Sequence, residues 1–286
     1  RIADTRAARL AGWFAGGLFL VATAASARII HVGPHESIKT VAQAARLAQD
    51  GDVVEIATGE YKGDVAIWTQ KRLIIRGVGR RPILSAAGMS AEGKATWVIR
   101  NGDFSISNLE FRGARAADGN GAGIRFELGK LHVVSCAFFD NQMGILTGSI
   151  PNGELIIENS IFAQAPKQKT PLPHLLYVGR IGLLRVIGSR FHGGYHGHLL
   201  KSRARISDIR YNLLVDGKAG SASYEADFPN GGDVTLVPLL ITNPSNLVHY
   251  TSTPGSGAVA IADVSAAFGH LYYQNPDDNS GMGSNQ

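Results

Sequence analysis

The stretch LHVVSCAFFDN (residues 131–141) begins with apolar residues, continues with a small polar pair, and reaches an aromatic residue just before a turn. A short apolar run that ends at a turn of Gly, Asp or Asn is typical of a short β-strand. Four other segments share this order: FSISNLEFRG (104–113), LIIENSIFAQ (155–164), LRVIGSRFHG (184–193) and IRYNLLVDG (209–217). The chain therefore contains an internal repeat.

The aromatic position of the repeat sets its length. Alignment on Phe111, Phe138, Phe162, Phe191 and Leu214 gives spacings of 27, 24, 29 and 23 residues. A second kind of short apolar run lies between these positions: GIRFE at 123, GILTG at 144, HLLYVG at 174 and HLLKSR at 198. Short strands at a period of about two dozen residues, without helices between them, predict a parallel β-solenoid in which each coil bonds to its neighbours.

The coils follow an amphipathic segment, residues 37–47, and the run GDVVEIATGEY (51–61). We predict that residues 37–47 form a helix that caps the open end of the solenoid and protects its strand edge. In this order of elements the chain resembles the right-handed parallel β-helix proteins of the pectin-lyase-like superfamily. The resemblance covers about residues 29–250 and implies an all-β, right-handed parallel β-helix, but it does not define one activity.

The two ends of the sequence differ from the repeat. Residues 1–27 combine a basic lead, a short apolar run and the small residues Ala25, Ser26 and Ala27, which is typical of a secretory signal peptide. We expect a secreted or periplasmic protein without a stable membrane span, with a β-helix domain over residues 28–250. Residues 251–286 contain no recognisable coil and are predicted to be irregular, as a cap or a truncated continuation.

Positive charge is concentrated in one part of the sequence. The formal net charge is +5, and the range 180–218 holds eight Lys or Arg residues against only Asp208 and Asp216. A basic face on an exported protein predicts an acidic partner. We therefore expect an acidic polysaccharide as partner and a monomeric protein, and we do not expect nucleic acid because no known nucleic-acid module is present.

The coil length predicts which side chains lie next to one another on the basic face. His174 and His198, Tyr177 and Lys201, and Lys201 and Glu225 are each 24 residues apart, so each pair is expected on neighbouring coils. Strand alternation then places Tyr177, Lys201 and Glu225 in one outward column, which Arg125 and Leu146 extend. A second outward column contains Arg203 and Asp227, whereas His198 falls on the inward side.

Such a face suits β-elimination at a uronate. A base removes the proton next to the carboxylate, a cation neutralises that carboxylate, and the glycosidic oxygen leaves. Lys201 is the candidate base, because neighbouring cations disfavour its charged form. Arg203 is the candidate carboxylate ligand. Arg125, Tyr177, His198 and Glu225 are the candidate substrate-binding residues.

Lys201 and Ser202 also resemble the Lys-Ser motif of the alginate lyase and chondroitinase B family. That resemblance implies a lysine base and a calcium ion that neutralises the uronate, with Glu225 and Asp227 as candidate ligands. The sequence departs from the family where Leu200 replaces an Asn and where residues 224–226 replace an Arg-His-Gly that supplies the acid. Arg203, Tyr177 or His198 would then have to act as the acid.

Other interpretations of the same residues remain open. Lys201 beside Glu225 and Arg203 beside Asp227 also fit a ladder of surface ion pairs. The protein would then be a non-catalytic carbohydrate-binding or surface-structural β-helix, and a uronate epimerase would use the same groups as a lyase. His192, His196 and His198 are a weaker candidate zinc site.

The turn positions of the coils carry a structural prediction. Asn212 and the analogous Ser135, Asn159 and Gly188 are expected to stack on one another in the left-handed backbone conformation.

Overall fold

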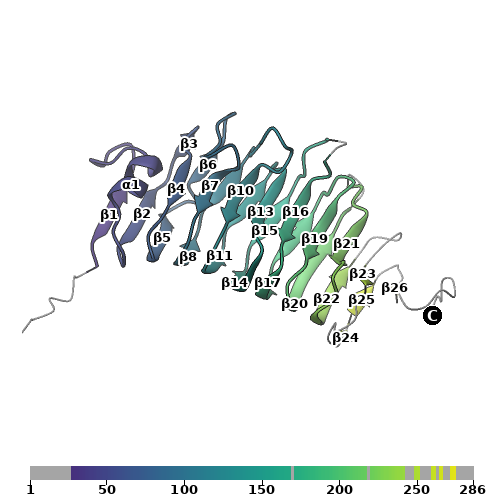
Figure 1. Ribbon diagram of the computed structural model, residues 1–286. Helices are drawn as coiled ribbons and strands as arrows, with labels where there is room; N and C mark the ends of the chain where they lie inside the picture. The colour runs from purple at the N-terminus through teal and green to yellow at the C-terminus, as the bar shows by residue number, and fades with distance from the viewer. Residues whose placement is uncertain are drawn as a thin grey trace, which may run out of the picture.

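Short parallel strands build the whole of the described molecule. The computed structural model describes residues 27–168, 171–217, 220–241, 248–251, 259–261, 264–266 and 271–274. They form a parallel β-solenoid of about eight turns, in which each strand pairs with strands one coil before and after it (Figure 1). The predicted fold class, an all-β parallel β-helix, is therefore confirmed.

The nine-stranded sheet of the described residues forms one wall of the solenoid. It faces the viewer across the middle of Figure 1. Its strands, in spatial order, are β4 (Ala66–Trp68), β7 (Ala95–Ile99), β10 (Ala122–Phe126), β13 (Met143–Thr147), β16 (His174–Val178), β19 (His198–Ser202), β21 (Tyr224–Phe228), β23 (Val248–Thr251) and β26 (Leu271–Gln274).

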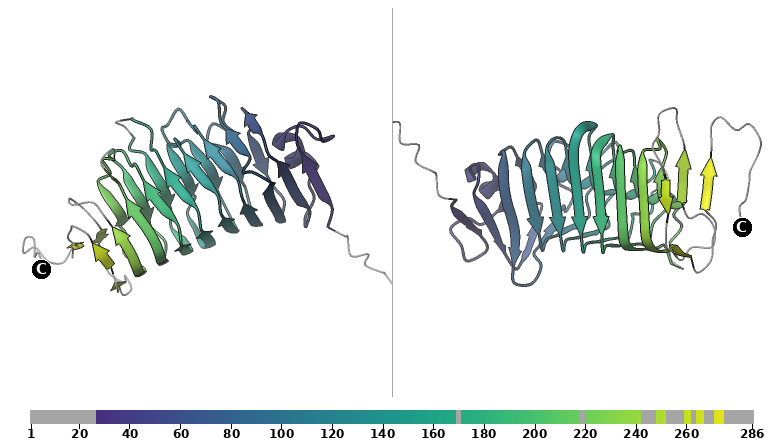
Figure 2. Two further views of the ribbon diagram at one scale, coloured as in Figure 1. Left: turned by 180° about the vertical axis from the view of Figure 1, so that it is seen from behind. Right: turned by 90° about the horizontal axis from the view of Figure 1, so that it is seen from below.

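A seventeen-stranded sheet supplies two further walls. The first contains β1 (Ile29–Val32), β2 (Val53–Ala57), β5 (Arg72–Val78), β8 (Asp103–Ser107), β11 (Lys130–Val134), β14 (Ile150–Glu158), β17 (Ile181–Ile187), β20 (Ile206–Val215), β22 (Asp233–Ile241) and β24 (Val259–Ile261). The second contains β3 (Glu60–Lys62), β6 (Ile83–Ser85), β9 (Glu110–Arg112), β12 (Ala137–Phe139), β15 (Ile161–Ala163), β18 (Arg190–His192) and β25 (Val264–Ala266). The long strands β20 and β22 pair with both walls and join them (Figure 2).

A helix covers the N-terminal end, as the sequence predicted, but it is shorter than expected. The helix α1 spans Val41–Leu47 and packs against β4 and β1. It begins late because Ile38 bridges to Val32 in an extended conformation and Thr40 is the N-cap, whose hydroxyl accepts a hydrogen bond from Gln43 N at 3.1 Å. The Asp64 carboxylate accepts hydrogen bonds from the backbone amides of Val41 and Ala42 and so satisfies two more free donors of the first turn.

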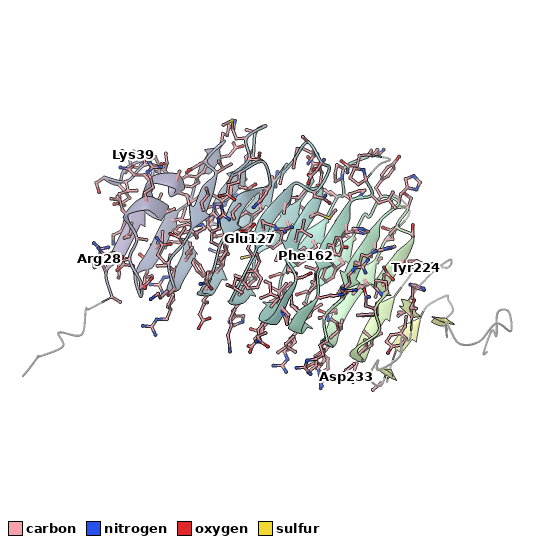
Figure 3. The ribbon with its side chains drawn as sticks, in the orientation of Figure 1. Arg28, Lys39, Glu127, Phe162, Tyr224 and Asp233 are labelled. Carbon is pink, nitrogen blue, oxygen red and sulfur yellow. The ribbon has the colours of Figure 1, made fainter. Side chains whose placement is uncertain are left out.

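An aromatic ladder runs through the core and confirms the repeat. Phe111, Phe138, Phe162, Phe191 and Leu214 pair strand to strand in the register that their spacing predicted. The four phenyl rings stack almost parallel, with centroids 5.2, 4.6 and 4.8 Å apart, and all four are buried. Figure 3 labels Phe162 in this ladder. Like residues on successive coils fill the narrow interior.

The corner between the two walls of the seventeen-stranded sheet is built from two-residue turns. Their first residue has a left-handed backbone, with φ between 50° and 62° at Asn108, Ser135, Asn159, Gly188 and Tyr211. The prediction that Asn212 occupies this position is wrong by one residue, because Tyr211 takes it.

Asn212 is instead the second residue of its turn, and it points inward. Its side-chain oxygen accepts a hydrogen bond from Ser189 N at 2.8 Å, and its amide group donates to Val186 O. Ser189 and Ser160 accept bonds in the same way from the coils before them, so the turns are linked by a buried polar ladder.

The predictions for the two ends of the chain compare differently with the structure. The proposed signal peptide lies outside the described residues except for Ala27. Beyond residue 250 the sequence predicted an irregular segment, but β24 and β25 pair with β22, and β26 pairs with β23, so the described parts of this segment continue both sheets. Among the described residues there is no helix that combines the length and the apolar character needed to cross a membrane.

Tyr211 is expected to limit stability, because a side chain disfavours the left-handed backbone that Gly and Asn adopt readily. Its φ is 57° and its side chain is exposed. We predict that Tyr211→Asn raises the free energy of unfolding by about 0.5–1 kcal/mol in urea denaturation. Tyr211→Ala is the control, since it removes the ring but keeps the backbone strain. An Asn variant no more stable than the Ala variant would contradict this account.

Candidate functional site

Each long strand of the nine-stranded sheet turns two consecutive residues inward, which decides what its outer face presents. In β19 both Leu199 and Leu200 lie in the core. In β10, a Cβ added to Gly123 would lie 3.0 Å from Phe111 and Phe138, so this position also faces the interior. The outward residues of β19 are consequently His198 and Lys201. The alternation expected from sequence placed His198 inward, and that placement is wrong.

Asp227 is the centre of a polar cluster on this outer face. The carboxylate lies on β21, is only 3% exposed, and contacts three basic side chains. Its Oδ2 atom lies 3.1 Å from Lys201 Nζ and 3.2 Å from His198 Nε2, and its Oδ1 atom lies 2.7 Å from His249 Nδ1. Strands β19, β21 and β23 are neighbours, so the stacking of coils brings these four side chains together (Figure 1). We call Lys201, His198, Asp227 and His249 the Asp227 cluster.

A row of aromatic rings runs beside the Asp227 cluster along the solenoid axis. Neighbouring rings have centroids 4.8–5.2 Å apart in the order Tyr177, His174, His198, Tyr224, His249. Lys201 Nζ lies 5.6 Å from the Tyr177 ring centroid, a cation–π distance. Figure 3 labels Tyr224 in this row. The site thus combines a fixed cation, a buried carboxylate and aromatic faces over several coils.

Burial keeps the two stacked histidines neutral. It lowers the pKa of His174 to about 2, and the neighbouring His198 ring and the charge of Lys201 act in the same direction. Burial also lowers the pKa of His198 to about 4, although Asp227 opposes the shift. In addition, His174 Nδ1 accepts a hydrogen bond from the backbone amide of His198 at 2.9 Å, so a proton cannot be added there without breaking that bond.

Asp227 stays ionised despite its burial. Burial alone would raise the pKa of its carboxyl group, but the hydrogen bonds from His249 and Lys201 and the charge of Lys201 outweigh it and hold the pKa below its ordinary value. The same hydrogen bond places a proton on Nδ1 of His249 and leaves the lone pair on Nε2, which lies 3.3 Å from Thr251 Oγ1.

The predicted outward column is confirmed on one side of Lys201 and wrong on the other. Arg125, Leu146, Tyr177 and Lys201 are in register on β10, β13, β16 and β19. The next residue in the column is Asp227, not Glu225. The expected spacing of 24 residues fails because the turn before β21 is longer than the turn before β19. Glu225 is fully buried on the inner side of β21, so it cannot meet a ligand on this face.

Arg203 lies beside the Asp227 cluster but has a different partner from the expected Asp227. It follows β19, and its guanidinium donates to Asn230 Oδ1. Its Nε atom is buried and has no hydrogen-bond partner among the described residues. Of the basic residues that the structure describes in the range 180–217, only Lys201 and Arg203 are in this site. Arg185, Arg190 and Arg210 belong to strands of the seventeen-stranded sheet, so a cluster in sequence is spread over several walls.

The candidate metal ligands do not come together. Glu225 faces the core while Asp227 is occupied by basic side chains, so the two cannot share a calcium ion. His192 ends β18 in the seventeen-stranded sheet and is exposed, whereas His198 is buried in the nine-stranded sheet. Within the described ranges no group of three or more His, Cys, Asp or Glu side chains could hold a metal ion.

His249 and Tyr224 belong to the site, but the sequence analysis did not propose a role for either. The signal for His249 was its strand-like run VHYT, 22 residues after Asp227, a spacing similar to the coil length. The signal for Tyr224 was only its place one coil after His198, which the assumed register had put inside.

Compared with known proteins, the chain matches no family model, no curated protein and no solved structure.

The neutral histidines predict that acid destabilises the fold. Their pKa values in the folded protein lie below the ordinary value of 6.5. Below about pH 6.5, these two histidines therefore bind protons in the unfolded chain but stay neutral in the folded chain. The free energy of unfolding must therefore fall as the pH drops from 6.5 towards 4. We predict that His174→Asn, which keeps a hydrogen-bond acceptor, reduces the loss between pH 7 and pH 5 by about 1–2 kcal/mol.

Urea denaturation at each pH measures this difference. The control is His35→Asn, at an exposed histidine far along the sequence from the site, and it should retain the pH dependence of the parent protein. Equal pH dependence in the parent and His174→Asn proteins would show that His174 does not resist protonation.

Proposed function

We propose that this protein binds an acidic polysaccharide on the outer face of the nine-stranded sheet and cleaves it by β-elimination at a uronate. The observation that carries the proposal is the Asp227 cluster, in which a buried carboxylate orients an imidazole beside a lysine. An imidazole held by a carboxylate is a recurring arrangement for proton abstraction, because the carboxylate fixes the tautomer and stabilises the imidazolium that forms.

His249 is the base in this proposal. Its Nδ1 atom is hydrogen-bonded to Asp227 at 2.7 Å, so the basic lone pair is on Nε2. A substrate would take the place of Thr251 Oγ1, which lies 3.3 Å from Nε2. Lys201 was the candidate base from the sequence, but its ammonium group is 3.1 Å from Asp227. A base must offer a lone pair, and an ion-paired ammonium does not. We therefore assign Lys201, together with Arg203, to neutralising the uronate carboxylate.

The reaction balances as follows. His249 Nε2 takes the proton from C5 of the uronate, and the electron pair of the broken C–H bond forms a double bond between C4 and C5. The bond between C4 and the glycosidic oxygen breaks, and the departing oxygen takes a proton from an acid. Tyr224 is the acid that we propose, because its ring stacks on the His249 ring at 5.0 Å and brings a phenol next to the imidazole.

A non-catalytic role in docking polyanions is the second candidate. The contacts within the Asp227 cluster favour this role. Lys201 and His198 already contact the Asp227 carboxylate, as they would in a purely structural ion-pair ladder. In that case the aromatic row and the cations would only hold the polysaccharide. An epimerase would share the proton abstraction at C5 but would return a proton to the opposite face instead of expelling the glycosidic oxygen.

Ultraviolet absorbance of the protein with a panel of polyuronates, with and without calcium, tests the proposal. We predict rising absorbance from the new conjugated double bond, and a rate at least about 100-fold lower for His249→Gln because a general base is removed. Lys201→Ala should lower the rate by about 100-fold as well, through loss of charge neutralisation. Lys62→Ala, at an exposed lysine on β3, is the matched control and should keep full activity.

Each other outcome identifies an alternative. An active His249→Gln protein with an inactive Lys201→Ala protein would return the role of base to Lys201. Deuterium uptake at C5 from heavy water without a gain in absorbance would indicate an epimerase. A flat trace on every substrate, with polysaccharide still retarding the protein in gels, would indicate the docking protein.

A further inference from the structure

A network of charged side chains crosses the outer face of the nine-stranded sheet on the N-terminal side of the Asp227 cluster. We call it the charged barrier, and it consists of Glu92, Lys94, Arg100, Arg125 and Glu127. Lys94 Nζ lies 2.7 Å from Glu127 Oε1 and 3.2 Å from Glu92 Oε2. Arg100 Nη1 lies 3.1 Å from Glu127 Oε2, and the other end of the same guanidinium contacts Glu92.

The charged barrier spans the full width of the sheet. Glu92 and Lys94 precede β7, whereas Arg100 follows it, so the contact between Glu92 and Arg100 joins the two ends of this strand. The chain doubles back at this point, because Ala91 pairs with Ala95 in an antiparallel bridge and Ala91 N donates to Ala95 O at 2.7 Å. Glu92 is thus carried over the outer face of β7.

An apolar layer fills the space beneath the charged barrier. Ala95, Val98, Ala122, Met143 and Leu146 are buried outward-facing residues of β7, β10 and β13, and Tyr177 packs against them. A polysaccharide cannot reach the strand surface here. On the described coils, the outward side chains become accessible from Tyr177 on β16, and Gly148, which follows β13, is partly exposed. Figure 3 shows the order along the axis through the labelled Glu127, which belongs to the barrier, and Tyr224, which belongs to the aromatic row.

A strip without side chains separates the charged barrier from Arg203. Glu127, Gly148, Gly179 and Arg203 follow one another at the same level of successive coils, one residue beyond the paired positions of their strands. A Cβ at Gly179 would lie only 2.5 Å from Gly148 O, whereas one at Gly148 would be 3.5 Å from its nearest neighbour. The distance from β10 to β19 is three strand spacings, about 14 Å, so only a short segment of ligand fits between the barrier and Lys201.

Arg125 lies in the column next to this strip, level with Leu146 and Tyr177, and about a quarter of its side chain is exposed. Its Nε atom is buried without a hydrogen-bond partner in the described part of the chain, and its contact with Glu127 Oε1 is long, at 3.9 Å. Arg203 borders the strip on the other side, and its Nε atom is likewise unpartnered among the described residues. Two guanidinium groups therefore flank a bare backbone surface, which suits an anionic sugar lying on the strip.

We propose that the charged barrier stops a bound polysaccharide, so that the protein takes its ligand by a chain end, with the terminal acidic sugar on Gly148 and Gly179 between Arg125 and Arg203. The inference rests on the proposed binding of an acidic polysaccharide to this face. The aromatic row runs along the solenoid axis, so a chain that follows it meets the barrier head-on. A protein of this kind removes short pieces from the end of a chain and does not cut within it.

The number of protein molecules bound per polysaccharide chain tests this directly and does not depend on cleavage. We would measure it by sedimentation velocity on size-fractionated polyuronates, with the His249→Gln protein to prevent cleavage. End binding predicts one protein per chain at every chain length. A number that grows in proportion to chain length would overturn the inference but leave the proposed polysaccharide binding intact, whereas no binding at any length would overturn both.

Variants of the charged barrier and of the strip test whether these two features cause binding at a chain end. Removing the link across β7 with Glu92→Ala and Arg100→Ala should make the bound number rise with chain length. The matched control is the ion pair of Glu55 and Arg76 on the seventeen-stranded sheet, and its double Ala substitution should leave one protein per chain. Gly148→Gln should weaken binding by about tenfold or more by filling the strip, whereas Ser105→Gln on β8 should not. An unchanged count in the barrier variant would contradict the barrier's role.

Discussion

The hydrogen-bonded stacking of each coil on the next is the constraint on which the rest of this structure depends. Parallel strands about 4.8 Å apart repeat around the solenoid, so a side chain meets only residues at the same level of adjacent coils. The interior uses this rule to stack four phenyl rings almost parallel. The outer face uses the same rule to place Lys201, Asp227 and His249 in contact, although 48 residues of sequence separate the first from the last.

The fold could be predicted from the sequence because each core aromatic residue lies just after the turn whose length varies least from coil to coil. Each coil from β8 to β18 has two residues between its last two strands, and the left-handed residue of that turn is three positions before the core Phe. The repeat of apolar residues therefore survives changes of coil length elsewhere. The cap helix was also predictable, but its start was not, since the bridge between Ile38 and Val32 decides where the helix begins.

The candidate site was only partly predictable. Arg125, Tyr177 and Lys201 were assigned correctly to one column, because the coils between them have the lengths that the alignment assumed. Asp227 was expected level with Arg203 and is level with Lys201, two residues earlier, because the coil that ends in β21 is two residues longer than the alignment assumed. The pair of inward residues in each strand, such as Leu199 and Leu200, also breaks simple alternation and hid His198 from the outer face. Neither effect leaves a clear trace in a single sequence.

In the coils between β9 and β21, the turns of unequal length lie at one corner of the solenoid. Between β9 and β21 the turns that lead into the nine-stranded sheet contain 9, 3, 10, 5 and 8 residues, whereas those that leave it contain 2 to 4. This corner borders the aromatic row and can change its length without disturbing the buried ladders. Natural insertions there would alter which ligand fits while the scaffold stays the same. The same corner is where foreign recognition loops could be grafted onto this solenoid.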